Sequence, residues 1–229
     1  MRWRELLFAH WPVGLDELRA LVPRAFELDT FQGRGWLGVV PFRMEDTKFR
    51  GAPSLGWAEN FLELNLRTYV RVGGRPGVWF FSLDAQSALA VAGARALFHL
   101  PYFTARMRAS RNADGIEYES ERSQSGAAAA RVRVSYAPSG PVFRAAPGTL
   151  EHFLTERYCL YALDSGGRVL RGEIDHDPWP LQPARASFTE QSLSTAAGFG
   201  PLLGAPLMHY AAELAVRAWA PTAVDSERH

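Results

Sequence analysis

One stretch of the sequence reads Phe61-Leu62-Glu63-Leu64-Asn65-Leu66-Arg67-Thr68-Tyr69-Val70-Arg71, and a second, Val78-Trp79-Phe80-Phe81-Ser82-Leu83-Asp84, follows it across the turn Gly73-Gly74-Arg75-Pro76-Gly77. Successive side chains of a β-strand point to opposite faces, so the even positions from Leu62 to Val70 form one apolar face. Glycine and proline between two such runs are typical of a hairpin turn. These segments predict two antiparallel strands whose apolar face packs in a core.

Short runs of the same kind continue along the chain, divided by turns that use 20 glycines and 15 prolines. We find no internal repeat and no long linker. The pattern predicts a mainly β (β-rich α+β) fold with a few short helices, in a single domain over residues 1–229. The expected strands are 28–30, 36–44, 61–71, 78–84, 102–110, 116–122, 130–136, 158–163, 168–174, 184–190 and 207–219. The expected helices are 15–21, 88–98 and 147–156, and the alanine-rich segment 207–219 suits a helix as well as a strand.

The composition excludes several classes of protein. Hydrophobic residues make up 47% of the chain and charged residues 21%, which are ordinary values for a globular protein. A chain of this length and composition can form a core without disulfides. Cys159 is the only cysteine, and no signal peptide or membrane-spanning run is visible, so we expect a cytoplasmic protein. The net charge of +1 gives no reason to expect nucleic acid or a membrane as a partner. Association into a homo-oligomer stays open.

A series of polar residues lies on the odd positions of the first strand: Glu63, Asn65, Arg67 and Tyr69. If the turn is centred near 74–75, Asn65 lies opposite Asp84 and Arg67 opposite Ser82. Further along, Tyr118, Ser120 and Arg122 share one face of another expected strand.

Most alternating polar faces of sheets are solvated, which is the first interpretation of this one. Asparagine, serine and tyrosine, and the bulky run 79–81 beside them, instead favour the wall of a cavity. In that case Arg122 is our candidate for the second cation that balances two buried carboxylates, and Glu63, Arg67 and Arg122 line one concavity with Tyr102 at its edge.

A second group of candidates is Glu156 and Arg157, at the expected junction between a helix and a strand. They are either a surface ion pair or part of the cavity, and we expect at least one of them to point into the cavity that holds Glu63. The segments His10-Trp11-Pro12 and His176-Asp177-Pro178-Trp179-Pro180 each order a loop over a pocket or fill a core.

Several kinds of chemistry have no signature in this sequence. The six histidines are too scattered to form a metal site, and we expect neither a metal nor a cofactor. No nucleophile elbow and no phosphate-binding loop is present, and Cys159 lies in an apolar strand that favours an inert thiol. Lys48 is the only lysine, so a Schiff base would require it or the amino terminus. Its polar surroundings predict an exposed side chain.

Several strings together resemble the YqjF-like family, which looks like a distant branch of the acetoacetate decarboxylase-like superfamily. They are His10-Trp11-Pro12, Trp36-Leu37-Gly38-Val39-Val40-Pro41-Phe42, the two strands quoted above, Leu100-Pro101-Tyr102 and Thr155-Glu156-Arg157-Tyr158. The resemblance covers nearly the whole chain. It implies a β-barrel or cone of antiparallel sheets, with short helices outside and a ligand cavity inside.

The same resemblance puts the superfamily's lysine chemistry in doubt. The segment 94–102 is similar to the motif that carries the Schiff-base lysine; Arg95 and Pro101 match it, and Tyr102 stands where the lysine belongs. Glu63 resembles the glutamate that faces this lysine. The resemblance therefore implies the cavity without the Schiff-base reaction.

Three hypotheses about function follow. In the first, the protein is an enzyme acting on a small carboxylate or carbonyl compound, with Arg67 or Arg122 holding the carboxylate, Glu63 as general acid or base, and Tyr102 as proton or hydrogen-bond donor. In the second, it is a non-catalytic protein that binds or senses a small anion. In the third, the polar residues form a buried network that only fixes the sheet. The other expected ligand-binding residues are Asn65, Tyr69, Ser82, Asp84, Tyr118, Glu156 and Arg157.

Overall fold

The computed structural model describes residues 1–47, 60–87, 91 and 98–224. Strands account for 57% of the described residues and helices for 9%, so the expected mainly β class is confirmed. The strands are β1 (Arg2–Val13), β2 (Glu27–Leu28), β3 (Gly35–Glu45), β4 (Phe61–Val72), β5 (Arg75–Ala85), β6 (Tyr102–Asn112), β7 (Gly115–Arg122), β8 (Arg131–Pro138), β9 (Cys159–Leu163), β10 (Val169–His176), β11 (Leu181–Gln191), β12 (Leu207–Ala218) and β13 (Thr222–Ala223). The helices are α1 (Leu15–Leu21), α3 (Leu150–Thr155) and α4 (Leu193–Ala196).

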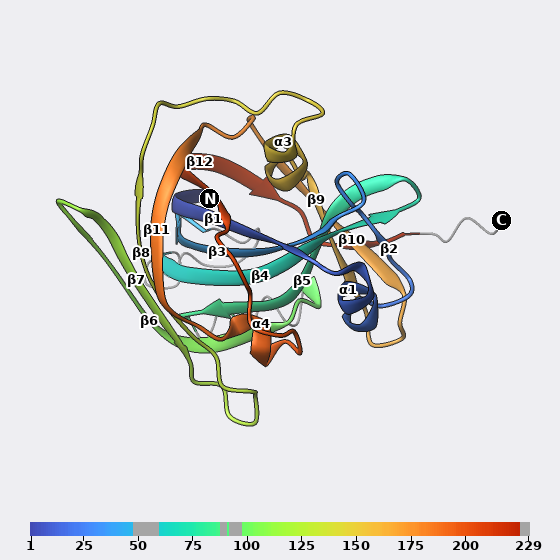
Figure 1. Cartoon of the computed structure of the whole chain (residues 1–229). Coiled ribbons are helices and arrows are strands. Elements are labelled where there is room, and N and C mark those ends of the chain that lie inside the picture. The colour runs from blue at the N-terminus through green and yellow to red at the C-terminus, as the bar shows by residue number, and fades with distance from the viewer. Residues whose placement is uncertain (48–59, 88–90, 92–97, 225–229) are drawn as a thin grey trace.

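Within the described residues, the strands form one sheet in the order β13-β10-β9-β5-β6-β7-β8-β11-β12-β1-β3-β4-β2. Two additional pairings, β5 with β4 and β10 with β12, close this order into two rings. One ring contains β6, β7, β8 and β11, the other contains β9 and β10, and both share β12, β1, β3, β4 and β5. The pairing is antiparallel except where β5 meets β6 and β9. In Figure 1 the shared strands β1, β3 and β4 cross the middle of the molecule, between the two groups.

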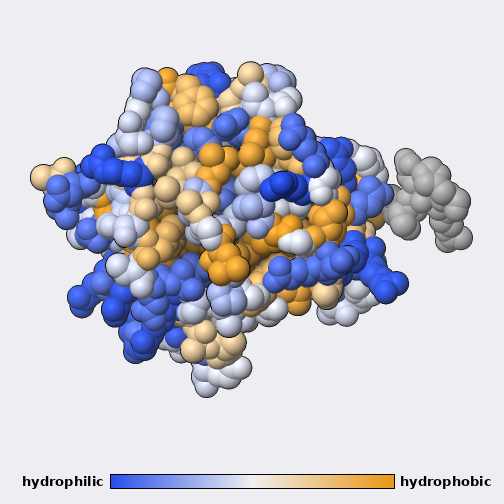
Figure 2. Space-filling view, in the orientation of Figure 1, coloured by the Kyte–Doolittle hydropathy of each residue, from blue (hydrophilic) through white to orange (hydrophobic). Residues whose placement is uncertain are grey.

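The shared strands have an interior on each face. Leu62, Leu64 and Leu66 of β4 pack in the core of the ring that contains β6, β7 and β8. Phe61 and Tyr69, on the opposite face of β4, pack in the core of the ring that contains β9 and β10. Every residue from 61 to 70 is therefore buried, and neither face of this strand is an outer surface. Figure 2 shows the outside: apolar residues gather across the middle of this view, with hydrophilic ones around them.

Most expected elements are present. The strands around the 73–77 and 113–115 turns, the helix at 15–21 and the strand over 207–219 are confirmed. The strand β1 was not predicted. Residues 6–11 are all buried, since the strand lies between the two interiors, so its sequence lacks the alternation that indicates a strand. Its pairing with β3 is also interrupted by a bulge, where Glu5 has a φ of 58°.

Other boundaries differ from expectation. Helix α3 begins at Leu150 instead of near residue 147, because the side chain of Thr149 caps it by accepting a hydrogen bond from the His152 amide. The strand expected at 28–30 is the short β2, and α4 was not predicted. The helix expected at 88–98 falls almost entirely outside the described residues. None of the helices in the described ranges has the length and apolar composition needed to span a bilayer.

The predicted register of the β4–β5 hairpin is wrong by one residue. Asn65 pairs with Leu83, Leu66 with Ser82 and Leu64 with Asp84. The chain turns at Gly73 and Gly74, whose positive φ values of 56° and 73° suit a two-residue hairpin turn, one position earlier than predicted. This turn alone would leave Ser82 and Asp84 on the face of Glu63. The pairing then shifts by one residue between Arg67–Phe80 and Leu66–Ser82, and this bulge moves Ser82 and Asp84 to the other face. Residues that lie opposite each other share a face of the sheet, so Ser82 and Asp84 face the leucine-rich interior, away from Glu63.

Candidate functional site

A cavity of about 130 Å³ lies inside the ring that contains β9 and β10. The polar face of β4 contributes Glu63, Asn65 and Arg67 to its wall. Tyr102 at the start of β6 and Arg157 after α3 add to the polar part, together with Thr47, Thr155 and His176. Of the 156–157 pair, Arg157 is a lining residue. The rest of the wall is mostly aromatic and aliphatic, and includes Trp3, Leu6, Phe8, Val40, Phe42, Phe61, Phe80, Leu83, Leu160, Ile174 and Trp179.

Glu63 is a buried carboxyl group without a cation beside it in the described part of the chain. Its side chain is 2% exposed, and burial raises its pKa to about 8, against the weaker opposite effect of the hydrogen bond from Tyr102. The Tyr102 hydroxyl donates to Oε2 over 3.0 Å. Glu63 is therefore mostly protonated at neutral pH. A carboxyl group of this kind can give a proton to a bound molecule or, once ionised, take one from it.

Arg67 is a buried cation on the same wall. Its Nη2 donates to the backbone oxygen of Leu154 over 3.2 Å, and its Cζ lies 5.4 Å from the centre of the Phe8 ring. Nε has no hydrogen-bond partner, and none of the described residues places a carboxylate at ion-pair distance from this guanidinium. Four residues of strand, roughly 13 Å, separate it from Glu63. The cavity thus has a cationic end at Arg67 and a neutral acid at Glu63.

The second arginine, Arg157, is already neutralised. Its Nη1 lies 2.6 Å from Oδ2 of Asp29, and both side chains are buried. Asp29 also binds Arg71, and Arg157 Nε donates to the Phe153 carbonyl oxygen. Burial lowers the pKa of Arg157, with Asp29 opposing this effect. Arg157 therefore adds little free positive charge to the cavity, and among the described arginines of the wall only Arg67 lacks a carboxylate partner.

Tyr69 and His10 are hydrogen-bonded to each other next to Arg67, outside the cavity wall. The Tyr69 hydroxyl donates to the Leu154 carbonyl over 2.7 Å and lies 2.6 Å from Nε2 of His10. Because the Tyr69 hydroxyl proton is donated to the Leu154 carbonyl, the hydrogen bond between Tyr69 and His10 must be donated by Nε2 of His10. Burial lowers the pKa of His10 well below its usual value, so this imidazole is neutral. A Cβ on Gly38 would lie 3.0 Å from the His10 ring, so the glycine makes this packing feasible. Tyr69 is not part of the cavity wall.

Four other candidates lie on the opposite face of β4 and β5, and their expected place in the cavity is wrong. Arg122 pairs with Asp84 over 2.7 Å, with both side chains buried, and burial raises the pKa of Asp84 despite this contact. Tyr118 donates its hydroxyl to the backbone oxygen of Glu63 over 2.7 Å. Ser82 lies beside them on the same face, because the hairpin register differs by one residue. Arg122 therefore balances Asp84 and does not reach Glu63.

Glu156 is buried but does not line the cavity. Its Oε1 accepts a hydrogen bond from the Trp179 amide over 2.9 Å, and its Oε2 accepts one from the Tyr158 hydroxyl over 2.5 Å. The residue thus fixes the 176–180 segment, which supplies Trp179 to the cavity wall. The sequence pattern around this tryptophan indicated either a pocket or a core, and the structure combines both.

Among the described residues, no group of three or more histidine, cysteine, aspartate or glutamate side chains is arranged to hold a metal ion. Cys159 is buried, and burial raises its pKa, which favours the thiol over the thiolate. Lys48, expected to be exposed, lies outside the described residues.

Comparison with solved structures defines the class of fold. The enduracididine biosynthesis enzyme MppR, solved in complex with pyruvate, matches with a TM-score of 0.64 and 14% identity over 97% of this chain and 88% of that one. Acetoacetate decarboxylase from Legionella pneumophila matches with a TM-score of 0.58 and 14% identity over 98% of this chain and 87% of that one. The chain has the acetoacetate decarboxylase-like fold, as its sequence resemblance implied.

Within that class, sequence comparison places the chain more narrowly. It belongs to the DUF2071 family, described as an uncharacterized conserved protein, whose model matches residues 1–215. A relative, the uncharacterized protein YqjF of Bacillus subtilis (strain 168), is 43% identical over 217 residues, which cover 95% of this chain and 88% of the relative. The expected YqjF-like membership is confirmed.

Proposed function

We propose that this protein binds a small carboxylate that carries a carbonyl group, and catalyses proton transfer on it without a Schiff-base lysine. The observation that carries the proposal is the buried Arg67, which has no carboxylate partner in the described residues, in a cavity that also holds the neutral acid Glu63. A buried cation without a partner is costly, and a bound anion would compensate for it. An apolar cavity with a few convergent polar groups is also the usual form of a small-molecule site.

The size of the cavity limits the ligand. A protein cavity of about 150 Å³ accommodates benzene, with six carbon atoms. The 130 Å³ here suits an acid of similar size, such as pyruvate. The MppR structure in complex with pyruvate shares the fold of this chain, and this similarity supports the choice of pyruvate as a first ligand.

In the proposed reaction Arg67 binds the carboxylate through its guanidinium and orients the acid. The ionised form of Glu63 removes a proton from the carbon next to the carbonyl group, and the electron pair of that C–H bond moves into a new C=C bond as the carbonyl oxygen becomes negative. Returning the proton to the carbonyl oxygen gives the enol and completes an isomerisation, whereas returning it to the same carbon regenerates the acid and exchanges its C–H proton. Tyr102 orients Glu63 through its hydrogen bond. Its second proposed role is to donate a hydrogen bond to the developing oxyanion.

The alternative is a protein that binds or senses a small anion without catalysis. Its support is that Glu63 is mostly protonated near neutral pH, so the cavity is suited to bind an anion even if no proton is transferred. The third hypothesis, a network that only fixes the sheet, has less support, because such a network needs neither a cavity nor an unpaired cation.

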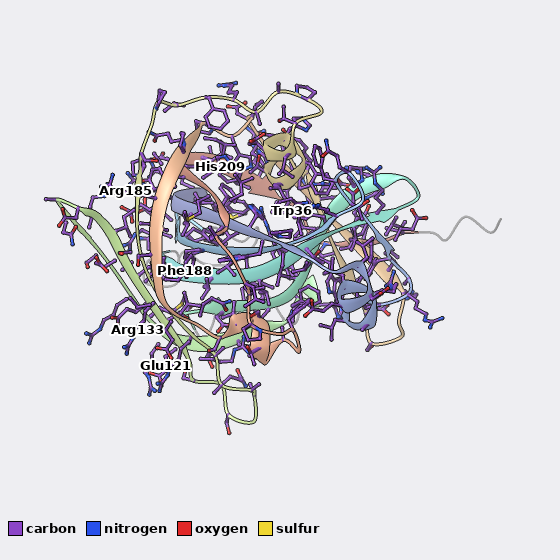
Figure 3. The ribbon with its side chains drawn as sticks, viewed as in Figure 1. Trp36, Glu121, Arg133, Arg185, Phe188 and His209 are labelled. Atoms are coloured by element: carbon purple, nitrogen blue, oxygen red, sulfur yellow. The ribbon has the colours of Figure 1, made fainter. Side chains whose placement is uncertain are left out.

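Titration calorimetry with pyruvate, 2-oxobutyrate and acetoacetate tests the proposal. Wild-type protein is expected to bind at least one of them, and Arg67→Met to lose at least about 10-fold in affinity, because a charge-assisted hydrogen bond contributes about 1.5–3 kcal/mol. Arg133→Met is the matched control, since this arginine lies on the outer face of β8, away from the cavity (Figure 3). Equal affinity of Arg67→Met and wild type would contradict the proposed site.

Glu63→Gln separates the enzyme from the binding protein. The amide has the size of the carboxyl group but cannot accept a proton in the reaction. If the protein is an enzyme, this variant should bind the ligand about as well as wild type and lose exchange of the ligand's C–H protons for deuterium in heavy water, followed by NMR. Wild-type protein that binds these acids without accelerating the exchange would be a binding protein.

A further inference from the structure

Two tryptophans of the cavity wall have indole N–H groups without an acceptor among the described residues. The Nε1 atoms of Trp3 and Trp179 are both buried and unpaired, and both residues belong to the cavity wall. Trp179 as a whole is only 2% exposed. Buried indole N–H groups usually have an acceptor, so two without one on the same wall require an explanation.

The position of Trp179 is fixed by its surroundings. Its backbone amide donates to Glu156, and its ring meets the Phe8 ring edge-on at 4.9 Å and stacks on Trp3 at 6.1 Å. These contacts hold the ring against rotation toward another acceptor. The Phe8 ring is also the one over which Arg67 lies, at 5.4 Å, so Trp179 and Arg67 flank the same side chain on the cavity wall.

An unpaired indole does not by itself make a ligand site. The Nε1 of Trp36, labelled in Figure 3, is also buried without a partner, but Trp36 does not line the cavity. Trp3 and Trp179 differ because their cavity also contains Arg67, which has no carboxylate partner among the described residues. The three donor groups on this wall thus suit one molecule with several acceptor oxygen atoms.

We propose that Trp179 donates a hydrogen bond from Nε1 to an uncharged oxygen of the bound acid, with Trp3 stacked on it as a second donor. This inference rests on the proposed function, in which Arg67 binds the carboxylate of the same molecule. A neutral N–H suits a carbonyl or hydroxyl oxygen better than a second carboxylate, which would need another cation. Trp179 is thus a specificity-determining residue that selects acids with a second, uncharged oxygen.

The test compares two ligands and two variants. Pyruvate carries an oxo group, whereas propionate keeps the carboxylate and lacks that oxygen. Trp179→Phe retains most of the ring and removes the N–H, so it should weaken pyruvate binding about 3- to 10-fold, the range of one hydrogen bond, and change propionate binding less than about 2-fold. Trp36→Phe removes an unpaired indole N–H away from the cavity and should leave both affinities unchanged.

Proton–nitrogen NMR of the indole groups gives a second measurement that a purely structural role would not affect. The Trp179 signal, assigned by its loss in Trp179→Phe, should move downfield when pyruvate binds, while the Trp36 signal stays in place. A stationary Trp179 signal, or equal weakening of pyruvate and propionate by Trp179→Phe, would overturn the inference and leave the Arg67 site intact. Failure of wild-type protein to bind either acid would overturn the inference together with the proposed function.

Discussion

Glu63 is a strong acid–base candidate because of where its strand lies. On the outer face of a sheet this carboxyl group would be ionised and paired with solvent. On a wall between two interiors it is 2% exposed, and burial raises its pKa to about 8. Tyr102 opposes this effect by donating to one carboxyl oxygen. The balance between these two interactions places the titration of Glu63 near physiological pH, where a group can both give and accept a proton.

The raised pKa of Glu63 links stability to pH. The folded protein holds this proton up to a pH of about 8, whereas an exposed glutamate loses it near the usual pKa of 4.5. Between these values the folded state binds more protons than the unfolded state, so the free energy of unfolding falls as the pH rises. Glu63→Gln lacks this dependence. Relative to wild type, it should gain stability on the order of a few kcal/mol between pH 5 and pH 8, measured by urea denaturation at each pH. A constant difference between the two proteins would contradict the buried, neutral carboxyl group.

Tyr102 should keep the pKa of Glu63 below the value that burial alone would give it. Tyr102→Phe removes the donor to Oε2, and because this hydrogen bond stabilises the carboxylate, its loss should raise the pKa of Glu63 above the wild-type value. The pH profile of C–H exchange on the ligand would then shift its rising limb to higher pH. Tyr136→Phe is the control, because that buried tyrosine donates to the backbone of Glu5, away from the cavity. A Tyr102→Phe profile that coincides with the wild-type profile would assign no role to this contact.

At the scale of the element, the sequence predicted that β4 is a strand with one apolar and one polar face, and that the polar face lines a cavity. It did not predict the partners of that face, because the pairing of two strands also depends on bulges that the alternation of residue types does not reveal. The shift by one residue between Arg67–Phe80 and Leu66–Ser82 moves Asp84 to the opposite interior. Strand β1 was missed for a related reason: a strand buried on both faces shows no alternation. Trp179 was recognised only as part of an aromatic segment, since nothing in the sequence places it opposite Phe8.

The corrected placement of Arg122 predicts a structural role. Arg122→Met leaves Asp84 buried without its cation, and losing one partner of a buried pair costs about 3–5 kcal/mol of unfolding free energy. The affinity of the folded variant for pyruvate should equal that of wild type, because Arg122 does not line the cavity. Urea denaturation and titration calorimetry on the same preparation measure both quantities. Loss of binding with unchanged stability would return Arg122 to the ligand site.

At the scale of the whole molecule, five strands belong to both rings of the sheet, so neither interior can lose its wall without exposing the other. We propose that the described chain unfolds as a single unit. Leu64→Ala opens the interior on one side of β4 and Leu160→Ala the interior that contains the cavity; truncation of a buried leucine typically costs about 2–5 kcal/mol. Each variant should shift one common transition, observed by tryptophan fluorescence and by far-ultraviolet circular dichroism. Two separate transitions in either variant would contradict the single unit.

The same arrangement explains why the family resemblance anticipated the fold and the cavity but not the arrangement of charges. The fold depends on many apolar positions, whereas the site depends on the pairing of a few charged residues. Among the described residues Arg67 has no carboxylate partner, since Asp29 pairs with Arg157 and Asp84 pairs with Arg122, two pairings between residues far apart in the sequence.

The central claim is that Glu63 is a neutral acid in the cavity that holds the unpaired Arg67. Carbon-13 NMR of labelled glutamate side chains measures it directly, with Glu63→Gln to assign the signal. The account predicts that the Glu63 carboxyl carbon titrates with a midpoint near pH 8, and that pyruvate moves the midpoint higher because a bound anion disfavours a second negative charge. A midpoint near the usual value of 4.5, with no change on adding pyruvate, would contradict it.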